Sequence, residues 1–285
     1  PRTFYGLLGS FLLNRKVKFN WAPPPLAKQA VAELANAPGG RRAVTLLQVG
    51  EDVRAERELR TVFSSAKPEL ARAMLALADR AEMPSLAMRL GNLLVSSSDE
   101  LYDSTAYPAP ALRAGKNKII DRELILAIVR QESGFNPKAK SHRGARGLMQ
   151  LMPGTAQYIA KQKVSRNTLF NAKHNVEFGV QYLRYLMDKL DNNPVLVTAS
   201  YNAGWRKVLE WLPENASLPV DIWIENIPYR ETRHYVKAVM AYQHIYEQQL
   251  GSNKNIFPQL TQDVIPSTES ITTHPVTGTL QLAPH

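Results

Sequence analysis

Apolar residues recur along most of the chain at helical spacing, and no strand-rich segment with alternating apolar and polar residues is evident. In the amino-terminal part, segments rich in Ala, Leu and Val are separated by Pro, Gly and Ser clusters. Several of these segments begin with proline, which favours the first position of a helix. The spacing predicts helices at residues 25–37, 41–49, 53–64, 68–81 and 84–95. Consecutive short helices of this kind are typical of a small helical solenoid or bundle.

A second helical unit follows a turn-rich stretch at residues 96–117, which predicts a domain boundary. After Gly251 the chain becomes rich in Ser, Thr, Pro, Gln and Asn, which predicts a flexible tail. Helices are predicted at 121–133, 153–163, 176–190, 194–203, 205–212 and 230–249. We therefore expect an all-α protein with helical domains over 1–100 and 113–249 and a flexible tail over 251–285.

The composition allows two modest cores and favours an anionic partner. The chain has 285 residues, 44% of them apolar, and a formal charge of +10. Such a charge favours nucleic acid, an anionic lipid surface or an acidic cell-wall polymer. The densest basic stretches, 113–118 and 161–166, lack the interleaved aromatic residues of a nucleic-acid groove. We therefore expect a solvated basic surface and no nucleic-acid partner.

The sequence lacks the residues and patterns needed for disulfides, for common metal sites and for a membrane-spanning segment. With no cysteine, disulfides, thiolate metal sites and cysteine nucleophiles are excluded. No paired histidines flank a glutamate and no Asp-rich calcium loop is present, so no metal or other cofactor is expected. The apolar run at residues 5–13 is too short to span a bilayer. Because the chain opens with Pro1 and shows no cleavage pattern, we expect a mature form or part of a longer precursor.

Glu132 is the most informative acidic residue. It follows three apolar residues at intervals of four along the predicted helix, so it continues an apolar ridge and should be poorly solvated. Gly134 favours a left-handed exit and Pro137 prevents continuation, which places Glu132 in the last turn. Burial and the negative end of the helix dipole both raise the pKa of this carboxyl, as a general acid requires. The helix alone is equally compatible with an exposed glutamate or one paired with an arginine.

Amide and apolar side chains follow Glu132 in an order that suits an N-acetylated sugar. The amides of Gln150 and Asn202 can bond acetamido and hydroxyl groups. Tyr201, Met149 and Met152 offer flat or adaptable apolar surface for sugar faces. Each of these residues taken singly is also compatible with core packing or loop capping, so the interpretation depends on their joint occurrence.

A conventional glycosidase needs a second carboxylate across the scissile bond. Asp121 lies about 16 Å away along the same helix, at about 1.5 Å per residue, and is too distant. Glu231 lies beside a polar and aromatic cluster, although an acidic residue at a helix start is equally explained by capping. One acid without a clear partner favours substrate-assisted chemistry, in which the sugar's acetamido oxygen replaces the nucleophile.

Taken as a set, four blocks resemble the catalytic domain of the soluble lytic transglycosylases, glycoside hydrolase family 23, whose fold is lysozyme-like. The resemblance extends over about residues 113–249. The four blocks are RQESGFNP at 130–137, GLMQLMPGTA at 147–156, SYNAG at 200–204 and IPYRETRHYV at 227–236. The amino-terminal region resembles, more weakly, the end of the family's helical superhelix and its linker domain. The resemblance therefore implies a lysozyme-like catalytic domain preceded by a superhelix and linker region.

The resemblance implies cleavage of the β-1,4 bond between N-acetylmuramic acid and N-acetylglucosamine, leaving a 1,6-anhydro ring. Glu132 would act as acid and then base, while Ser141 and Tyr201 would steady the acetamido group and the cation. Ser133, Gln150, Met152 and Asn202 would line the saccharide groove. Glu231 and Tyr235 would contact the sugar or its stem peptide.

The same resemblance implies peptidoglycan strands and stem peptides as partners, other cell-wall enzymes as candidate partners, and a location in the bacterial envelope or periplasm. A hydrolytic muramidase on this fold and a non-catalytic glycan-binding scaffold remain alternatives. The sequence departs from the family pattern after Gly204, where the family often continues with Pro and Gly but this chain has Trp205 and Arg206. His142 follows Ser141 where a smaller or stiffer residue is common. Both departures put subsite preferences in doubt.

Overall fold

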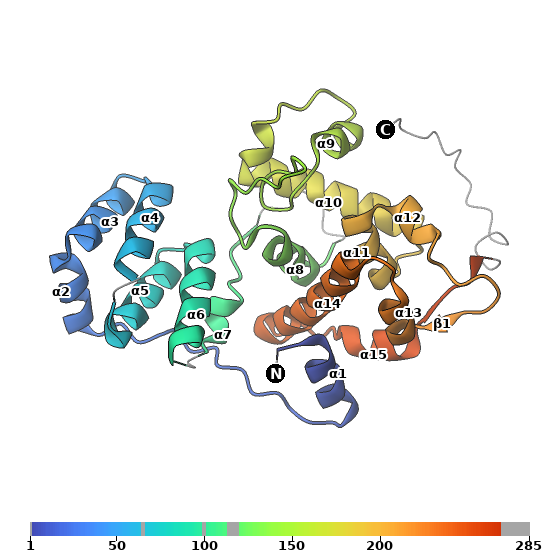
Figure 1. The fold of residues 1–285 in the computed structure, drawn as a ribbon, viewed down its shortest axis with the longest axis horizontal. Helices are drawn as coiled ribbons and strands as arrows, with labels where there is room; N and C mark the ends of the chain where they lie inside the picture. Colours follow the sequence, from blue (N-terminus) through green and yellow to red (C-terminus); the bar gives the residue numbers. More distant parts are fainter. Residues whose placement is uncertain (1, 64–65, 99–100, 113–119, 269–285) are drawn as a thin grey trace. The chain divides into compact units, whose positions relative to one another are not determined.

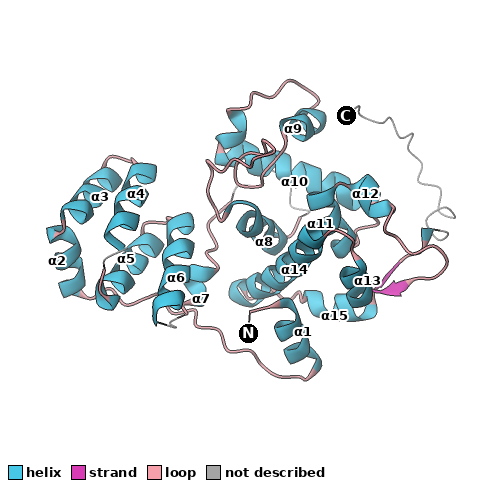
Figure 2. Cartoon of the chain, viewed as in Figure 1, coloured by secondary structure: helices cyan, strands magenta, loops and turns pink. Residues whose placement is uncertain are grey.

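The computed structural model describes residues 2–63, 66–98, 101–112 and 120–268 (Figure 1). The regular secondary structure of the described chain is helical except for one short pair of strands (Figure 2), so the all-α prediction is confirmed. The described residues fall into two compact units. Unit 1 comprises those within 1–17 and 112–285, and unit 2 comprises those within 18–111.

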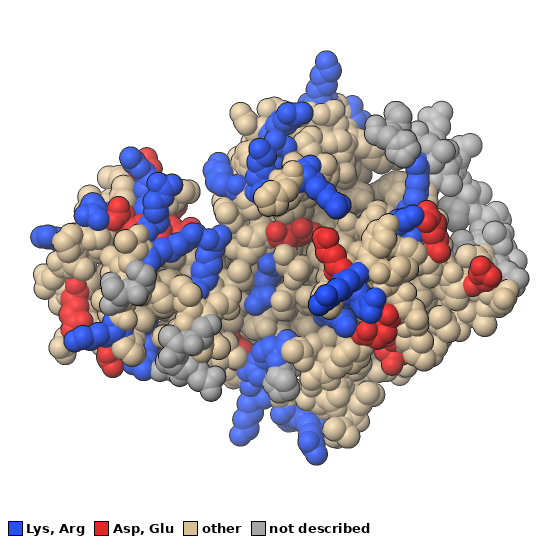
Figure 3. Space-filling view, viewed as in Figure 1, with Lys and Arg blue, Asp and Glu red and all other residues tan. Residues whose placement is uncertain are grey.

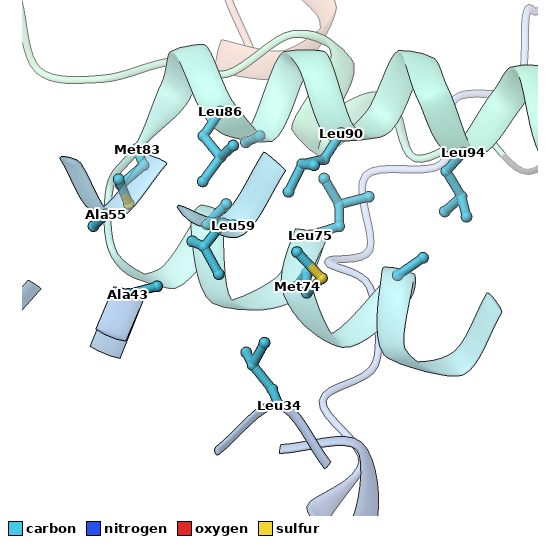
Figure 4. Close-up of a cluster of buried hydrophobic side chains, with 13 residues drawn as sticks. Leu34, Ala43, Ala55, Leu59, Met74, Leu75, Met83, Leu86, Leu90 and Leu94 are labelled. Atoms are coloured by element: carbon cyan, nitrogen blue, oxygen red, sulfur yellow. The ribbon is translucent and has the colours of Figure 1, made fainter. Parts of the chain in front are cut away.

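Unit 2 contains six helices within its described residues, and five of them correspond to the predicted segments. Pro38, Pro68 and Pro84 each occupy the first position of a helix, where the missing amide hydrogen costs no intrahelical bond. Leu59, Leu86 and Leu90 are among the leucines and alanines that fill the core between the helices (Figure 4). The helices are α2 Lys28–Asn36, α3 Pro38–Gln48, α4 Asp52–Phe63, α5 Pro68–Arg80, α6 Pro84–Ser98 and α7 Asp103–Ala106.

Unit 1 is organised around two helices, α8 (Arg122–Ser133) and α14 (Arg230–Leu250), which pack side by side (Figure 1). A third helix, α11 (Pro194–Ala203), packs against α14 and is almost wholly buried. The other elements are α1 Phe4–Leu12, α9 Pro153–Ala160, the 3-10 helix η1 Thr168–Phe170, α10 Ala172–Lys189, α12 Trp205–Leu209, β1 Leu218–Pro219, α13 Val220–Asn226, α15 Ile256–Gln262 and β2 Val264–Ile265.

The amino-terminal segment differs from the expected single domain over 1–100. Its apolar run forms α1, whose first turn is capped by the Thr3 side chain, and α1 belongs to unit 1 rather than unit 2. The ring centroid of Phe257 lies 6.3 Å from that of Phe4 and 5.9 Å from that of Phe11. These apolar residues therefore complete the core of unit 1, which explains why α1 separates from the helices that follow it.

The segment after Gly251 also differs from the expected flexible tail over 251–285. Its few apolar residues, Ile256, Phe257, Leu260 and Ile265, are all buried, and they fix α15 and β2 on unit 1. β2 pairs antiparallel with β1. A segment with few apolar residues can therefore be ordered when each of these residues is buried. Residues 269–285 of the expected tail lie outside the described residues, as do 99–100 and 113–119 of the expected boundary.

Lysine and arginine side chains are distributed over the face shown in Figure 3 rather than gathered in one patch. Lys161, Lys163 and Arg166 of one predicted basic stretch are exposed, and the other stretch, 113–118, lies outside the described residues. None of the helices in the described ranges combines the length and apolar character needed to cross a bilayer.

Candidate active site

Glu132 lies in the last turn of α8, as its spacing predicts. The preceding residues Leu124 and Ile128 are buried on the same ridge. The helix ends at Gly134, which has φ +54° and donates its amide hydrogen to the Arg130 carbonyl. An apolar ridge and a glycine exit therefore hold the Glu132 carboxyl at the end of a buried helix.

The Glu132 side chain is half-buried, and its Oε1 accepts a hydrogen bond of 2.7 Å from the Tyr235 hydroxyl of α14. Loss of solvation on burial raises the pKa of Glu132 to about 7. The Tyr235 hydrogen bond lowers this pKa and the negative charge of Glu231 raises it. Within the described ranges no lysine or arginine forms an ion pair with Glu132, so an arginine clasp is not its environment. The carboxyl can therefore exist in both protonation states near neutral pH.

Two tyrosines share the electrostatic environment of Glu132. Burial and the Glu132 charge both raise the pKa of Tyr201 and that of Tyr235 well above the usual value. Both hydroxyls are therefore neutral hydrogen-bond donors. Tyr201, on α11, donates to the Met149 carbonyl over 2.9 Å. α8, α11 and α14 thus bring one titratable carboxyl and two neutral hydroxyls together.

The loop between α8 and α9 folds tightly on itself. The Ser141 amide donates to the Ala145 carbonyl over 3.0 Å, and Ser141 Oγ accepts a bond of 3.0 Å from the Ala145 amide. Arg146 pairs in short bridges with Lys140 and Leu151. The Ser141 hydroxyl keeps its proton for another acceptor, and His142 beside it is exposed. Among the described residues, no hydrogen bond joins Ser141 to Glu132.

Asn175 anchors this loop to α10, and the sequence analysis missed it. Its side chain is fully buried. Oδ1 accepts from the Met149 amide at 2.7 Å, and Nδ2 donates to the carbonyls of Arg146 and Leu169 at 2.8 and 2.9 Å. One signal in the sequence could have identified Asn175. It is a polar residue on the apolar face of a predicted helix, next to Val176 and four residues before Gly179.

Gln150 has its side-chain amide directed back into the loop. Nε2 donates to the carbonyls of Ala139 and Gly147 at 3.1 and 2.8 Å. Because both amide hydrogens are engaged, a ligand can use only Oε1. The residue adopts φ +47°, and this left-handed backbone is held by the same two bonds.

The two methionines expected to face a sugar are placed differently. Met152 is 43% exposed at the start of α9 and is available to a ligand. Met149 is completely buried, and a side chain at Gly179 would collide with it. The expected role of Met149 as sugar-contacting surface is therefore wrong, because its side chain packs on α10. Its contribution is the backbone carbonyl that accepts from Tyr201.

The remaining predicted site residues lie on α8, α11 and α14. The Ser133 hydroxyl donates to the Val129 carbonyl of its own helix. Asn202 Oδ1 accepts from Thr232, which leaves the Asn202 amide hydrogens for another acceptor. Glu231 is exposed in the first turn of α14 and acts on Glu132 through its charge.

No group of three or more His, Cys, Asp and Glu side chains is arranged to hold a metal ion within the described part of the chain.

Comparison with known protein families gives two matches. Residues 110–224 match the family described as the transglycosylase SLT domain. The match includes α8 to α12 and the first part of α13, and thus Glu132, Tyr201 and the loop between α8 and α9. Residues 226–255 match the soluble lytic transglycosylase helical domain and include α14, which carries Tyr235.

Individual relatives agree with these matches. The soluble lytic murein transglycosylases of Escherichia coli and Salmonella typhimurium are 39% and 38% identical over 150 and 155 residues, or 50% and 52% of this chain. The chain covers only 23% and 24% of their length. Two solved structures resemble 90% or more of this chain. The structure of the lytic transglycosylase Slt from Pseudomonas aeruginosa has a TM-score of 0.77 and 32% identity, and the match covers 90% of this chain and 42% of that one. The structure of the 70-kDa soluble lytic transglycosylase of E. coli has a TM-score of 0.79 and 28% identity, and the match covers 92% of this chain and 43% of that one.

The two matched regions together contain the half-buried Glu132 carboxyl, its two tyrosines and the loop anchored by Asn175. Residues 110–224 are therefore a transglycosylase SLT domain, and the chain is a relative of the soluble lytic transglycosylases.

Proposed function

We propose that this chain cleaves the β-1,4 bond between N-acetylmuramic acid and N-acetylglucosamine in peptidoglycan, forming 1,6-anhydromuramic ends. The relatives named as murein transglycosylases support the substrate class. The observation that carries the proposal is the pKa of Glu132, raised to about 7 in a half-buried site with a neutral hydroxyl donor. A group with such a pKa can give up a proton and take one back at neutral pH.

In the proposed reaction the Glu132 carboxyl protonates the glycosidic oxygen as the bond to the anomeric carbon breaks. The 2-acetamido oxygen bonds to that carbon and forms an oxazolinium ion. The Glu132 carboxylate then removes the proton of the muramic C6 hydroxyl, and the C6 oxygen displaces the acetamido oxygen. The proton on Glu132 is restored, no water is consumed, and the products are an anhydro end and a free hydroxyl.

The neighbouring residues suit supporting roles in this reaction. Tyr235 holds Glu132 in place and stabilises the carboxylate form between the two proton transfers. Ser141 and Tyr201 are proposed to steady the acetamido group and the developing cation. The electron-rich oxygens of these groups suit a positive charge.

Substrate contacts are proposed for five side chains that the structure leaves partly or fully exposed. They are Ser133, Gln150 through Oε1, Met152, Asn202 through its amide and Glu231. Tyr235 is buried with its hydroxyl on Glu132, so we assign it to positioning the acid. The proposed location is the bacterial envelope, where the substrate lies.

Digestion of purified sacculi tests the proposal. Mass spectrometry should show anhydromuropeptides without new reducing ends. Release of reducing muramic ends would instead identify a hydrolytic muramidase. Glu132→Gln should lower turnover by at least about 10²-fold, the range for removal of a general acid and base, while glycan binding persists. Unchanged turnover in this variant would contradict the assignment, and absence of turnover in both proteins would favour a glycan-binding scaffold.

A further inference from the structure

A row of aromatic rings leads from Tyr201 toward the surface of unit 1. The ring of Tyr182, on α10, lies 5.4 Å from that of Tyr201. The Tyr185 ring follows at 6.3 Å from Tyr182, with the two planes only 15° apart. The Tyr158 ring, on α9, lies 5.6 Å from that of Tyr185 in an edge-on arrangement. The row therefore connects the candidate active site to an outer group of aromatic residues.

The outer group brings together side chains from three helices. Tyr158 of α9 and Trp205 of α12 both lie close enough to the Tyr185 hydroxyl to influence its pKa. Burial raises the pKa of Tyr185 to about 12, and this keeps the hydroxyl neutral. Three elements thus bring aromatic side chains together, and Tyr158 is 46% exposed.

Arg206 adds a positive charge to the same group. Its guanidinium carbon lies 5.7 Å from the centroid of the Trp205 ring, and its charge lowers the pKa of Tyr185. Arg206 is exposed and, in the part of the chain that the structure describes, forms no ion pair with a carboxylate. The neighbouring Lys207, in contrast, is paired with Glu210.

We propose that Tyr158, Tyr185, Trp205 and Arg206, here called the aromatic platform, bind a sugar ring of the glycan strand beyond the cleavage site. The rings offer flat apolar surface for the sugar face, and their polar tips can orient its hydroxyls. Arg206 binds a carboxylate of the stem peptide carried by that sugar. The proposal rests on the proposed function for the identity of the strand.

Packing alone explains the platform less well. Single exposed aromatic residues are common on protein surfaces. Here, however, three aromatic side chains from three elements converge beside an unpaired cation, and their ring row is continuous with Tyr201. A sugar with an attached carboxylate can contact the aromatic rings with its face and pair with the Arg206 charge, so it is the occupant that we choose.

Trp205 can be replaced without disturbing the helix that carries it. It is the first residue of α12 and follows Gly204, which has φ +87°. Proline is well tolerated at this position, because the first amide hydrogens of a helix have no intrahelical partner. Trp205→Pro therefore removes the indole ring while α12 can still form.

Binding by the inactive Glu132→Gln protein tests the platform directly. We would measure its Kd by calorimetry for disaccharide peptides and for long peptidoglycan strands. Adding Trp205→Pro or Tyr158→Ala should weaken binding of long strands by about threefold to tenfold, the worth of one aromatic contact. Binding of the disaccharide peptide should not change. The proposal would be overturned if the added substitution left the affinity for long strands unchanged, or if it weakened binding of both ligands equally.

Matched variants separate the platform from general damage. Tyr5→Ala makes the same change at an equally exposed tyrosine on α1, 46% exposed, and should leave both Kd values unchanged. Arg206→Ala should weaken binding only of strands that retain their stem peptides, and equal weakening for peptide-free strands would contradict the carboxylate contact. Because these measurements record binding to the Glu132→Gln protein, they do not depend on the product that the wild-type protein forms. Absence of anhydro products from the wild-type protein would overturn the proposed function and leave the platform test standing.

Discussion

At the scale of single residues, Glu132 is in an environment where two effects oppose each other. Burial disfavours the carboxylate, and the Tyr235 hydroxyl favours it. The pKa of about 7 shows that burial is the larger effect. The ionised form is therefore less stable in the folded protein than in the unfolded chain, and this side chain reduces folding stability at the pH where it is useful.

This cost predicts a pH-dependent gain in stability for Glu132→Gln. The pKa of Glu132 is 4.5 when unfolded and about 7 when folded, so its stabilising protonated form is lost as the pH rises through that interval. The wild-type free energy of unfolding should fall there by up to about 3 kcal/mol relative to the variant. Urea unfolding at pH 4.5 and pH 8 would measure it. A difference that is the same at both pH values would contradict the prediction.

Glu231→Gln tests the contribution of the Glu231 charge to the pKa of Glu132. Removing this negative charge should lower that pKa, so the alkaline limb of the kcat profile should move to lower pH. The shift should shrink in high salt, because Glu231 is exposed and its field is screened. Glu214→Gln, at another exposed position, should leave the profile unchanged. An unshifted limb in Glu231→Gln would show that this charge does not act on the acid.

Sequence spacing was sufficient to place Glu132 but not its partner. Helical periodicity and Gly134 defined the end of α8, and these are local signals. The Tyr235 hydroxyl reaches Glu132 only because α14 packs against α8, a contact between residues 103 positions apart. Met149 was misassigned because an apolar residue in a loop can point to either side, and only the packing against Gly179 decides which.

At the scale of elements, the loop between α8 and α9 depends on α10 for its position. Asn175 satisfies one amide and two carbonyls of otherwise irregular backbone. A buried loop carries polar groups that cost free energy if unpaired, so one asparagine decides whether the loop can stay in place.

Asn175→Ala should therefore destabilise unit 1 by about 3 kcal/mol or more, because three buried backbone groups lose their partner. It should also lower kcat, since the Met149 carbonyl that accepts from Tyr201 is no longer fixed. Thermal unfolding and turnover on sacculi would measure both effects. Asn171→Ala, at the exposed cap of α10, removes a single bond to His174 and should cost about 1 kcal/mol with kcat unchanged. Retained kcat in Asn175→Ala would contradict the argument.

The elements themselves were predictable where apolar residues are dense. The five longer helices of unit 2, α2 to α6, and helices α8 and α14 follow periodic apolar patterns, and α11 is a nearly continuous apolar run. α1 and α15 escaped prediction because Gly6 and Gly9 interrupt the first and polar residues surround the second. Their order comes from the mutual packing of Phe4, Phe11 and Phe257, which no short window of sequence contains.

At the scale of the whole molecule, segments from both ends of the described chain complete the core of unit 1. Glu247 of α14 is buried and accepts the Ile256 amide, which fixes the start of α15. Tyr5 of α1 bonds to Glu225 over 2.5 Å. The phenylalanine cluster, Phe4, Phe11 and Phe257, lies between these two helices, and its removal should separate them.

Phe257→Ala should lower the free energy of unfolding of unit 1 by about 3–5 kcal/mol, the usual loss for a buried phenylalanine. Calorimetry would measure this loss as a lower Tm. Val264→Ala, on β2 and 50% exposed, is the control and should cost less than about 1 kcal/mol. Equal effects of the two variants would show that α15 does not contribute to the core as described.

α1 belongs to unit 1, but in the sequence all of unit 2 separates it from α8. This order has a consequence for synthesis on the ribosome. α1 leaves the exit tunnel long before its partners, since Tyr5 and Glu225 are 220 positions apart. Unit 2 can bury its own leucines during that interval, because every residue of its core precedes α8. Until α15 arrives, the aromatic face of α1 remains uncovered, so the nascent chain should be most vulnerable to chaperone binding and proteolysis after unit 2 has already folded.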